Sequence, residues 1–184
     1  MIDQFIDKIK EDETNWVKYK DKFIQRDIPA KTILLAEGEG PTYFYFIKKG
    51  CLRMCFDKDG KDITYQFFFE GQAVASIDSL LNNNPSMFTI ESIEPSTIIS
   101  ISKVDLYEIH KLYPELKEGF QNILFQRFRN YAQLFLSRIK DTPKERYDDL
   151  VVNHPEIIRR IPQHYIASYL GITPVSLSRI RSRK

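Results

Sequence analysis

The last 28 residues of the chain, 157–184, combine two short helical patterns with a strong positive charge. They hold six Lys/Arg and no Asp or Glu. The first helical pattern runs from Gln163 to Leu170, Gly171 interrupts it, and the second pattern begins at Thr173. Two short helices joined by a Gly-containing turn form a helix-turn-helix, whose second helix fits the major groove of DNA. The pattern therefore predicts a DNA-binding module, with the preceding residues serving to sense a signal and to pair two such modules.

The charge of the chain is unevenly distributed, although its net value is only +2. Residues 1–137 carry 17 Lys/Arg and 20 Asp/Glu, a net charge of −3, whereas residues 138–184 carry 10 and 5, a net charge of +5. The first part would repel a polyanion and the second would attract one. A basic segment can also be no more than a solvated surface, so charge alone leaves nucleic-acid binding undecided.

The composition, with 42% hydrophobic and 28% charged residues, is that of a globular protein, and 184 residues suit one large domain or two small ones. No apolar run reaches the roughly 18 residues that suggest a membrane span, and the N-terminus lacks a signal-peptide core, so we expect a cytoplasmic protein. Cys51 and Cys55 are too few for a disulfide framework, and no nearby His or Cys cluster completes a metal site. We therefore expect buried thiols, no metal ion and no cofactor.

Between Phe23 and Ser102 the sequence consists of short β-like runs separated by turn residues. At least six runs recur at intervals of about ten residues, which is typical of an antiparallel sandwich or barrel. Asp59-Gly60 is a strong signal for a two-residue hairpin turn. The predicted strands are Thr32–Leu35, Tyr43–Ile47, Leu52–Phe56, Ile63–Phe69, Met87–Ile93 and Thr97–Ile101.

Helical patterns flank this region. Ser102 can cap a helix that runs to about Leu112, and Thr142 with Glu145 predicts a capping box for a later helix. Between them, residues 114–140 form one long helix with an apolar stripe at steps of three and four. The stripe can pack along its own domain or pair with a second copy in a coiled-coil-like dimer, and it does not by itself decide between the two. Its residues are Leu116, Phe120, Ile123, Leu124, Phe128, Tyr131, Leu134 and Phe135.

The order of a β-rich domain, a long helix and a helix-turn-helix resembles the bacterial cyclic-AMP receptor protein / Fnr (Crp/Fnr) family of transcription regulators. The matching stretches are Glu145-Arg146-Tyr147, His154-Pro155-Glu156, Ile166 to Pro174, Leu177 to Ile180 and, more loosely, Gly38-Glu39, Tyr45 to Ile47, Lys49-Gly50 and Gly71. The resemblance implies an α+β fold with three parts: an antiparallel β-roll sensor over residues 1–113, a dimerisation helix over 114–140 and a helix-turn-helix over 141–184. It implies double-stranded DNA, a second copy of the chain and RNA polymerase as partners, with no membrane. Family members often continue into a β-hairpin wing, and because the sequence stops soon after the second helix we expect this wing to be absent.

The sensor departs from the family pattern where a cyclic nucleotide would bind. Members that bind one carry Gly-Glu for the ribose and, about ten residues on, an Arg-Ser/Thr pair for the phosphate. Here Ala75-Ser76 and Ser86-Met87 stand at these places, and no Lys or Arg lies between residues 61 and 103. A buried phosphate without a cation loses its charge-assisted contact, so we predict that the chain does not bind cyclic AMP in the usual way. The residues of this effector pocket are Gly71, Ala75, Ser76, Ser86 and Met87, and its effector is unknown. Residues 1–50 contain no Cys, which excludes the N-terminal iron–sulfur cluster of Fnr-type members.

Within the predicted helix-turn-helix, Thr173 caps the second helix and Pro174 takes its first position. Arg179 is the best candidate for a base contact, because Arg can bond guanine through two hydrogen bonds, although a phosphate contact is equally open. The full set of predicted DNA-binding residues is Gln163, Thr173, Ser176, Ser178, Arg179, Arg181 and Arg183.

The sequence leaves two hypotheses of different classes. The first is a homodimeric, sequence-specific transcription regulator. The second is a ligand sensor of the same fold that acts through protein partners without binding DNA. An enzyme has little support, since no phosphate-binding glycine loop, metal-ligand pattern or nucleophile elbow is present.

Overall fold

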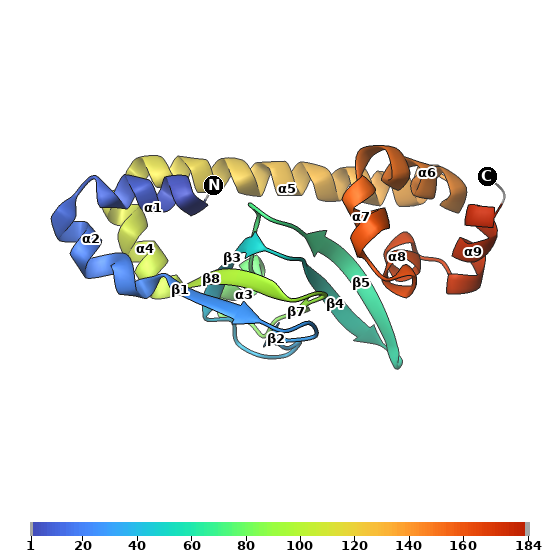
Figure 1. The fold of residues 1–184 in the computed structure, drawn as a ribbon, viewed down its shortest axis with the longest axis horizontal. Helices are drawn as coiled ribbons and strands as arrows, with labels where there is room; N and C mark the ends of the chain where they lie inside the picture. The colour runs from blue at the N-terminus through green and yellow to red at the C-terminus, as the bar shows by residue number, and fades with distance from the viewer. Residues whose placement is uncertain (1, 183–184) are drawn as a thin grey trace. The chain divides into compact units, whose positions relative to one another are not determined.

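The computed structural model describes residues 2–182 and divides them into two compact units. One, here called the β-sheet unit, comprises the residues up to Phe56 together with Gln66–Lys117. The other, the helical unit, comprises Asp57–Tyr65 and the residues from Glu118 onward. Figure 1 shows the elements of both units.

The β-sheet unit contains two antiparallel sheets. Their strands are ordered β1-β8-β3-β6 and β2-β7-β4-β5, so that neighbours in a sheet are mostly distant in sequence. The predicted antiparallel β-domain is therefore confirmed. The strands are β1 (Ile24–Ile28), β2 (Ile33–Leu35), β3 (Tyr43–Lys49), β4 (Leu52–Lys58), β5 (Lys61–Phe68), β6 (Ala73–Val74), β7 (Thr89–Ser92) and β8 (Ser96–Ser102).

The core of this unit consists of aliphatic and aromatic side chains, and along β3 and β4 four consecutive residues are buried. Ile90 and Ile98 are completely buried, and so are Leu52 and Ile101. Both cysteines are buried and free, as predicted. The turn at Asp59-Gly60 joins β4 to β5, and both residues have positive φ, 55° and 77°, which is the backbone that a two-residue hairpin of this type requires.

Two of the strands were not predicted from the sequence, and one was predicted too long. β1 is mostly exposed and reads Ile-Gln-Arg-Asp-Ile, so it shows no apolar run, and β6 has only two residues. The strand predicted from Met87 begins at Thr89, because Ser86 forms hydrogen bonds with the loop and its hydroxyl accepts from the Phe88 amide at 3.2 Å. These local bonds take the place of ladder bonds just before β7.

The helices of the β-sheet unit precede and follow its strands in sequence, except for α3, which lies between β6 and β7. Ser102 caps α4 by accepting a hydrogen bond from the Asp105 amide at 3.0 Å, as predicted. The helices are α1 (Ile2–Lys10), α2 (Glu13–Tyr19), the short 3-10 helix η1 (Lys20–Lys22), α3 (Ile77–Asn82) and α4 (Lys103–Leu112).

The long helix α5 (Pro114–Lys140) leads into four shorter helices, α6 (Pro143–Asn153), α7 (Pro155–Arg160), α8 (Gln163–Leu170) and α9 (Pro174–Ser182). The predicted capping box of α6 is present: the Glu145 amide donates to the Thr142 hydroxyl, and the Thr142 amide donates to the Glu145 carboxylate at 2.7 Å. None of the helices described in residues 2–182 is long and apolar enough to cross a membrane.

Candidate nucleic-acid interface

The predicted helix-turn-helix is formed by α8, Gly171 and α9. Gly171 ends α8 in the left-handed conformation, with φ of 70°, and the amide of Ile172 donates to the Ala167 carbonyl at 2.9 Å. This is the glycine-dependent helix end that turns the chain sharply. Thr173 then caps α9, since its hydroxyl accepts from the Ser176 amide at 3.1 Å. The sequence prediction of the turn, the cap and Pro174 as the first residue of the helix is confirmed.

The two helices are held by a small apolar core. Ala167 and Leu177 are fully buried, and the absence of a larger side chain at Ala167 allows α8 and α9 to approach closely. Tyr147 and Leu150 of α6 and Ile157 of α7 are also buried, so all four short helices contribute. Ile166 and Leu170 of α8 are also buried, whereas Ile172 and Ile180 are half-buried.

Two arginines fix the C-terminal end of α8. The Arg138 guanidinium donates to the Tyr169 carbonyl at 2.9 Å, and the Arg146 guanidinium donates to the Leu170 carbonyl at 3.0 Å. Cations at this position satisfy carbonyls that lack a partner within the helix and interact favourably with its dipole. Arg146 also donates to the Asp141 carbonyl at 2.7 Å, so one side chain joins the start of α6 to the end of α8.

The predicted DNA-binding side chains differ in how far they are available. Gln163, Ser178, Arg179 and Arg181 are exposed, and within residues 2–182 their side chains form no hydrogen bond. The hydroxyls of Thr173 and Ser176 instead bond to each other at 3.0 Å as part of the cap of α9. Arg183 lies outside the described residues.

The exposed surface of α9 also includes apolar groups. Val175, at 60% exposure, lies one helical turn before Arg179, so the two side chains lie on the same face. An exposed Arg, an exposed aliphatic group and hydroxyls on one surface of a short helix are the groups that contact guanine, thymine methyl and phosphate in the major groove.

In the β-sheet unit, three buried serines occupy the predicted effector pocket, and we call Ser76, Ser79 and Ser86 the serine cluster. The Ser76 hydroxyl lies 2.9 Å from the hydroxyls of both Ser79 and Ser86. Ser86 also donates to the Phe88 carbonyl at 2.7 Å, and Ser79 donates to the Pro85 carbonyl at 3.2 Å. Sequence reasoning placed Ser76 and Ser86 together but did not identify Ser79.

The other predicted pocket residues differ from one another in their exposure to solvent. Ala75 is buried, whereas Gly71 and Met87 are exposed. Two backbone hydrogen bonds of 2.8 Å, between Gly38 and Ser86 and between Ser86 and Glu39, tie the loop after β2 to the serine cluster.

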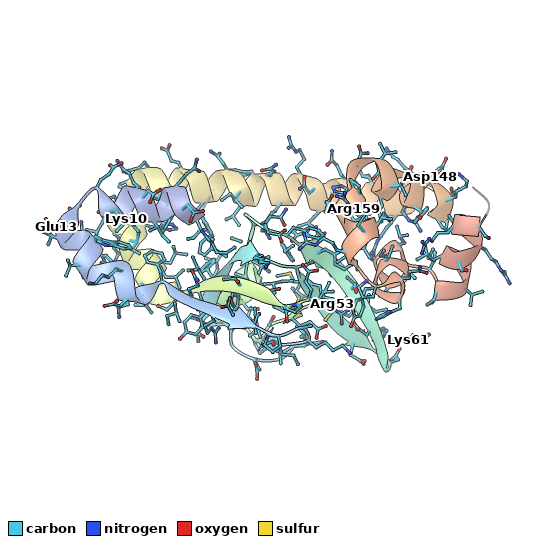
Figure 2. The ribbon with its side chains drawn as sticks, in the orientation of Figure 1. Lys10, Glu13, Arg53, Lys61, Asp148 and Arg159 are labelled. Carbon is cyan, nitrogen blue, oxygen red and sulfur yellow. The ribbon has the colours of Figure 1, made fainter. Side chains whose placement is uncertain are left out.

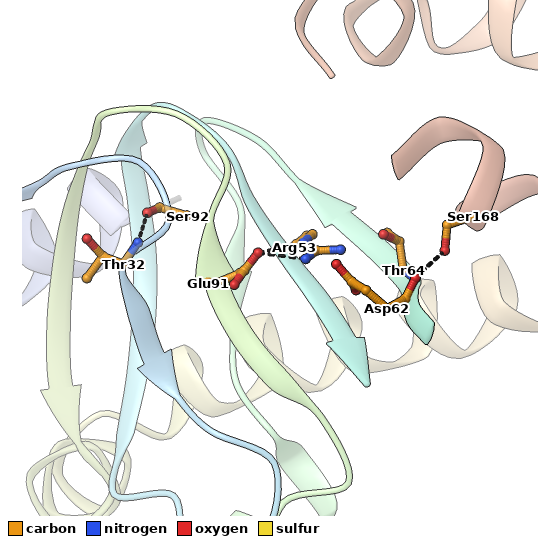
Figure 3. Close-up of polar contacts among 7 residues, drawn as sticks. All are labelled: Thr32, Arg53, Asp62, Thr64, Glu91, Ser92 and Ser168. Atoms are coloured by element: carbon orange, nitrogen blue, oxygen red, sulfur yellow. Dashed lines mark hydrogen bonds and ion pairs between the residues drawn. The ribbon is translucent and has the colours of Figure 1, made fainter. Parts of the chain in front are cut away.

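A buried cation is present in this unit, but it is already paired. Arg53 of β4, labelled in Figure 2, is 3% exposed. Its guanidinium contacts the Glu91 carboxylate of β7 at 2.7 and 2.8 Å (Figure 3). The two residues are direct cross-strand neighbours. Breaking such a pair would leave a buried charge without compensation, so Arg53 contributes to the sheet itself. Within residues 2–182, no group of three or more His, Cys, Asp or Glu is arranged to hold a metal ion.

The long helix α5 presents two apolar faces. Six residues of the predicted stripe are half-buried, and Tyr131 among them packs its ring 5.3 Å from that of Tyr65. A second face is exposed and includes Phe125 and Ile139, which were not in the predicted stripe, together with Phe128 and Phe135, which were.

Comparison with known proteins agrees with this architecture. Residues 25–113 match the family model of the cyclic nucleotide-binding domain. The curated relatives include the rat protein named patatin-like phospholipase domain-containing protein 7, which is 28% identical over 108 residues. That match covers 58% of this chain but only 8% of the relative, so the chain spans a small part of that protein.

Among solved structures, a cyclic nucleotide-binding domain containing protein from Listeria monocytogenes has a TM-score of 0.74 at 18% identity, over 99% of this chain and 89% of that one. The global regulator CLP from Xanthomonas campestris, described as responsive to c-di-GMP, has a TM-score of 0.73 at 14% identity, over 94% and 91%. CooA from Carboxydothermus hydrogenoformans has a TM-score of 0.71 at 15% identity, over 89% and 76%. Residues 25–113 are therefore similar to the cyclic nucleotide-binding domain, and the chain shares the fold of these solved structures.

Proposed function

We propose that the protein is a homodimeric transcription regulator that binds a specific DNA sequence through α8 and α9. The observation that carries this proposal is the exposed face of α9, on which Arg179 projects beside Val175 from a helix whose cap and core are complete. Arg181 is exposed on another side of the same helix. The second helix of a helix-turn-helix contacts base edges with such a face. The net charge of +5 over residues 138–184 would add sequence-independent attraction to phosphates.

The exposed face of α5 supports pairing with a second copy. Phe125, Phe128, Phe135 and Ile139 are 72%, 74%, 64% and 66% exposed, and with Ala132 they follow alternating steps of three and four. Such spacing forms the apolar seam of a two-stranded coiled coil. Four large apolar side chains on one helix face are unusual on a monomer surface, and a parallel copy would bury them. Two helix-turn-helix modules would then reach neighbouring half-sites on DNA.

In this proposal, the effector of the cyclic nucleotide-binding domain is not a cyclic nucleotide bound in the usual way. The serine cluster joins the two positions at which the family pattern would hold ribose and phosphate, and it contains no charged group. Its hydroxyls bond to one another and to backbone carbonyls, so a cyclic phosphate would meet no cation there. We infer that the domain responds to a ligand without a buried phosphate, or that it responds to none.

The test is binding of the full chain to double-stranded DNA selected from a random pool, measured by fluorescence anisotropy at several salt concentrations. We expect sequence-preferring affinity that weakens as salt is raised. Arg179→Ala should weaken specific binding by roughly 1–3 kcal/mol. Arg179→Lys separates the two roles of this side chain, because Lys preserves a phosphate contact but cannot donate two parallel bonds to guanine.

Arg26→Ala, a change of the same type in the β-sheet unit, is the matched control and should leave DNA affinity unchanged. If the pool yields no preferred sequence, or if Arg179→Ala binds like the unchanged protein, the DNA proposal fails. The alternative hypothesis of a sensor that acts through protein partners would then take its place.

A further inference from the structure

Strand β5 lies at the edge of its sheet, and its first part belongs to the helical unit. The order β2-β7-β4-β5 leaves one side of β5 without a neighbouring strand. An edge strand presents a row of backbone N–H and C=O groups that another element must satisfy or water must solvate. Residues Lys61 to Tyr65 of this strand fall in the helical unit, whereas Gln66–Phe68 fall in the β-sheet unit.

One hydroxyl from the helix-turn-helix serves two of these edge groups. The Thr64 amide donates to the Ser168 hydroxyl at 2.9 Å, and the same hydroxyl donates to the Asp62 carbonyl at 3.0 Å (Figure 3). A serine hydroxyl can accept and donate at once. Ser168 therefore satisfies the backbone groups of residues 62 and 64 in place of a further strand. Ser168 is on α8, the first helix of the helix-turn-helix.

A second contact holds the adjacent residue of the same strand. The ring of Tyr65 lies 5.3 Å from that of Tyr131 of α5, at an interplanar angle of 40°. Thr64 itself is fully buried. Residues 62, 64 and 65 are therefore all fixed to helices of this unit, through one bifunctional hydroxyl and one aromatic pair.

We propose that the Ser168 hydroxyl couples the tip of the β4–β5 hairpin to the helix-turn-helix, so that a change in the hairpin is transmitted to α8. The physical basis is covalent continuity. β4 pairs with β7 inside the cyclic nucleotide-binding domain, and the chain runs from β4 through Asp59-Gly60 into the segment that Ser168 holds. The significance of this coupling for regulation rests on the proposed DNA-binding function, but the coupling itself does not.

The coupling is weak enough to be reversible. A typical hydrogen bond formed in exchange for bonds to water changes an equilibrium by about two- to tenfold. Two such bonds on one side chain can hold α8 in one orientation and can also be broken by a modest change in the hairpin. A coupling of this size matches the range in which binding at one site modulates another.

The experiment measures hydrogen exchange of backbone amides in the full chain. It compares the unchanged protein with variants substituted in α8, in the hairpin, and in both. Ser168→Ala should speed exchange of the Thr64 amide about tenfold, because it loses its acceptor. Gly60→Val changes the other end: Gly60 has φ of 77°, a conformation that a β-branched residue tolerates poorly. We expect Gly60→Val to speed exchange in α8 several-fold when Ser168 is present, and to add nothing when Ser168 is replaced by Ala.

Two controls accompany this cycle. Ser168→Thr retains the hydroxyl and should retain most of the protection at Thr64. Ser137→Ala, the same substitution on α5, should leave both segments unchanged. If Gly60→Val has no effect on α8, or has the same effect in both backgrounds, Ser168 does not transmit the change and the inference is wrong.

DNA binding by the same variants is measured separately. If the unchanged protein binds a selected DNA, Ser168→Ala should alter its affinity by about threefold or more, in line with the loss of two hydrogen bonds. If the unchanged protein binds no DNA, the proposed function fails, while the exchange cycle still decides whether the coupling exists.

Discussion

The serine cluster of the β-sheet unit and the outer face of α9 use similar polar groups in opposite ways. In the cluster, the hydroxyls of Ser76 and Ser86 are buried and bond to each other. On α9, Ser178 and Arg179 are exposed, and the hydroxyls of the first turn are bonded only within the cap. A buried polar group must have a partner inside the protein, whereas an exposed one loses little by exchanging water for another partner. The comparison indicates that α9 is prepared for an external polar ligand and that the serine cluster is not.

The largest expected effect tests whether the two regions are stabilised independently. Leu177 in the helix-turn-helix and Leu80 in α3 are both almost fully buried. Leu177→Ala should destabilise the helical unit by roughly 2–5 kcal/mol and abolish DNA binding, because the cavity it leaves lies directly under α9. Leu80→Ala should cost a similar amount in the β-sheet unit. Amide exchange during denaturant titration would measure each effect locally, and loss of protection in both units from either substitution would contradict independence.

The second effect concerns the exposed face of α5. Phe128→Asp combined with Phe135→Asp should convert a dimer to a monomer, since each central aromatic of an interface contributes roughly 2 kcal/mol or more. Analytical ultracentrifugation measures the change in mass. Gln126→Asp with Gln133→Asp places the same charges at exposed positions off this face and should leave the dimer intact. A monomer in the unchanged protein at high concentration would rule out this face as a dimer seam.

The third effect addresses the serines of the two regions directly. Ser86→Ala removes the partner of Ser76 and of the Phe88 amide, so it should destabilise the β-sheet unit by about 1–3 kcal/mol. Ser178→Ala should change stability by no more than about 0.5 kcal/mol, because this side chain is exposed. Urea denaturation of the two variants compares them. Equal losses of stability in the two variants would show that the difference in burial between Ser86 and Ser178 has no energetic consequence.

The features that the sequence predicted correctly are mostly local. The hairpin at Asp59-Gly60, the capping box of Thr142 with Glu145 and the helix end at Gly171 each depend on residues within a few positions of one another. Propensity and spacing are sufficient to predict such features.

The features that the sequence did not predict are interactions between distant residues. Ser168 and Thr64 are 104 residues apart, and nothing in the composition of either segment indicates that one hydroxyl satisfies an edge strand. The contacts of Arg138 and Arg146 with α8 were not predicted, although their guanidinium groups cap the end of that helix. On α5 the apolar stripe was recognised, but its division into a half-buried and an exposed face depends on which elements pack against it, and the exposed Phe125 was missed.

The smallest expected effect uses the buried phenol of the helix-turn-helix as a local probe. Burial raises the pKa of Tyr169 to about 12 from its ordinary value of 10.0, and the nearby positive charge of Arg138 only partly opposes this rise. Because the folded-state pKa is the higher one, the stabilisation from the neutral phenol is complete below pH 10 and is lost as the pH rises toward 12. At pH 11 the helical unit should be less stable by about 1 kcal/mol. Tyr169→Phe should reduce this alkaline loss, as measured by thermal unfolding between pH 9 and 11, whereas Tyr107→Phe, at an exposed position of α4, should not. Part of the loss should persist, because burial also raises the pKa values of Tyr65 and Tyr45. An alkaline loss as large in Tyr169→Phe as in the unchanged protein would show that the phenol is not buried as described, and that α8 packs less tightly than its buried side chains indicate.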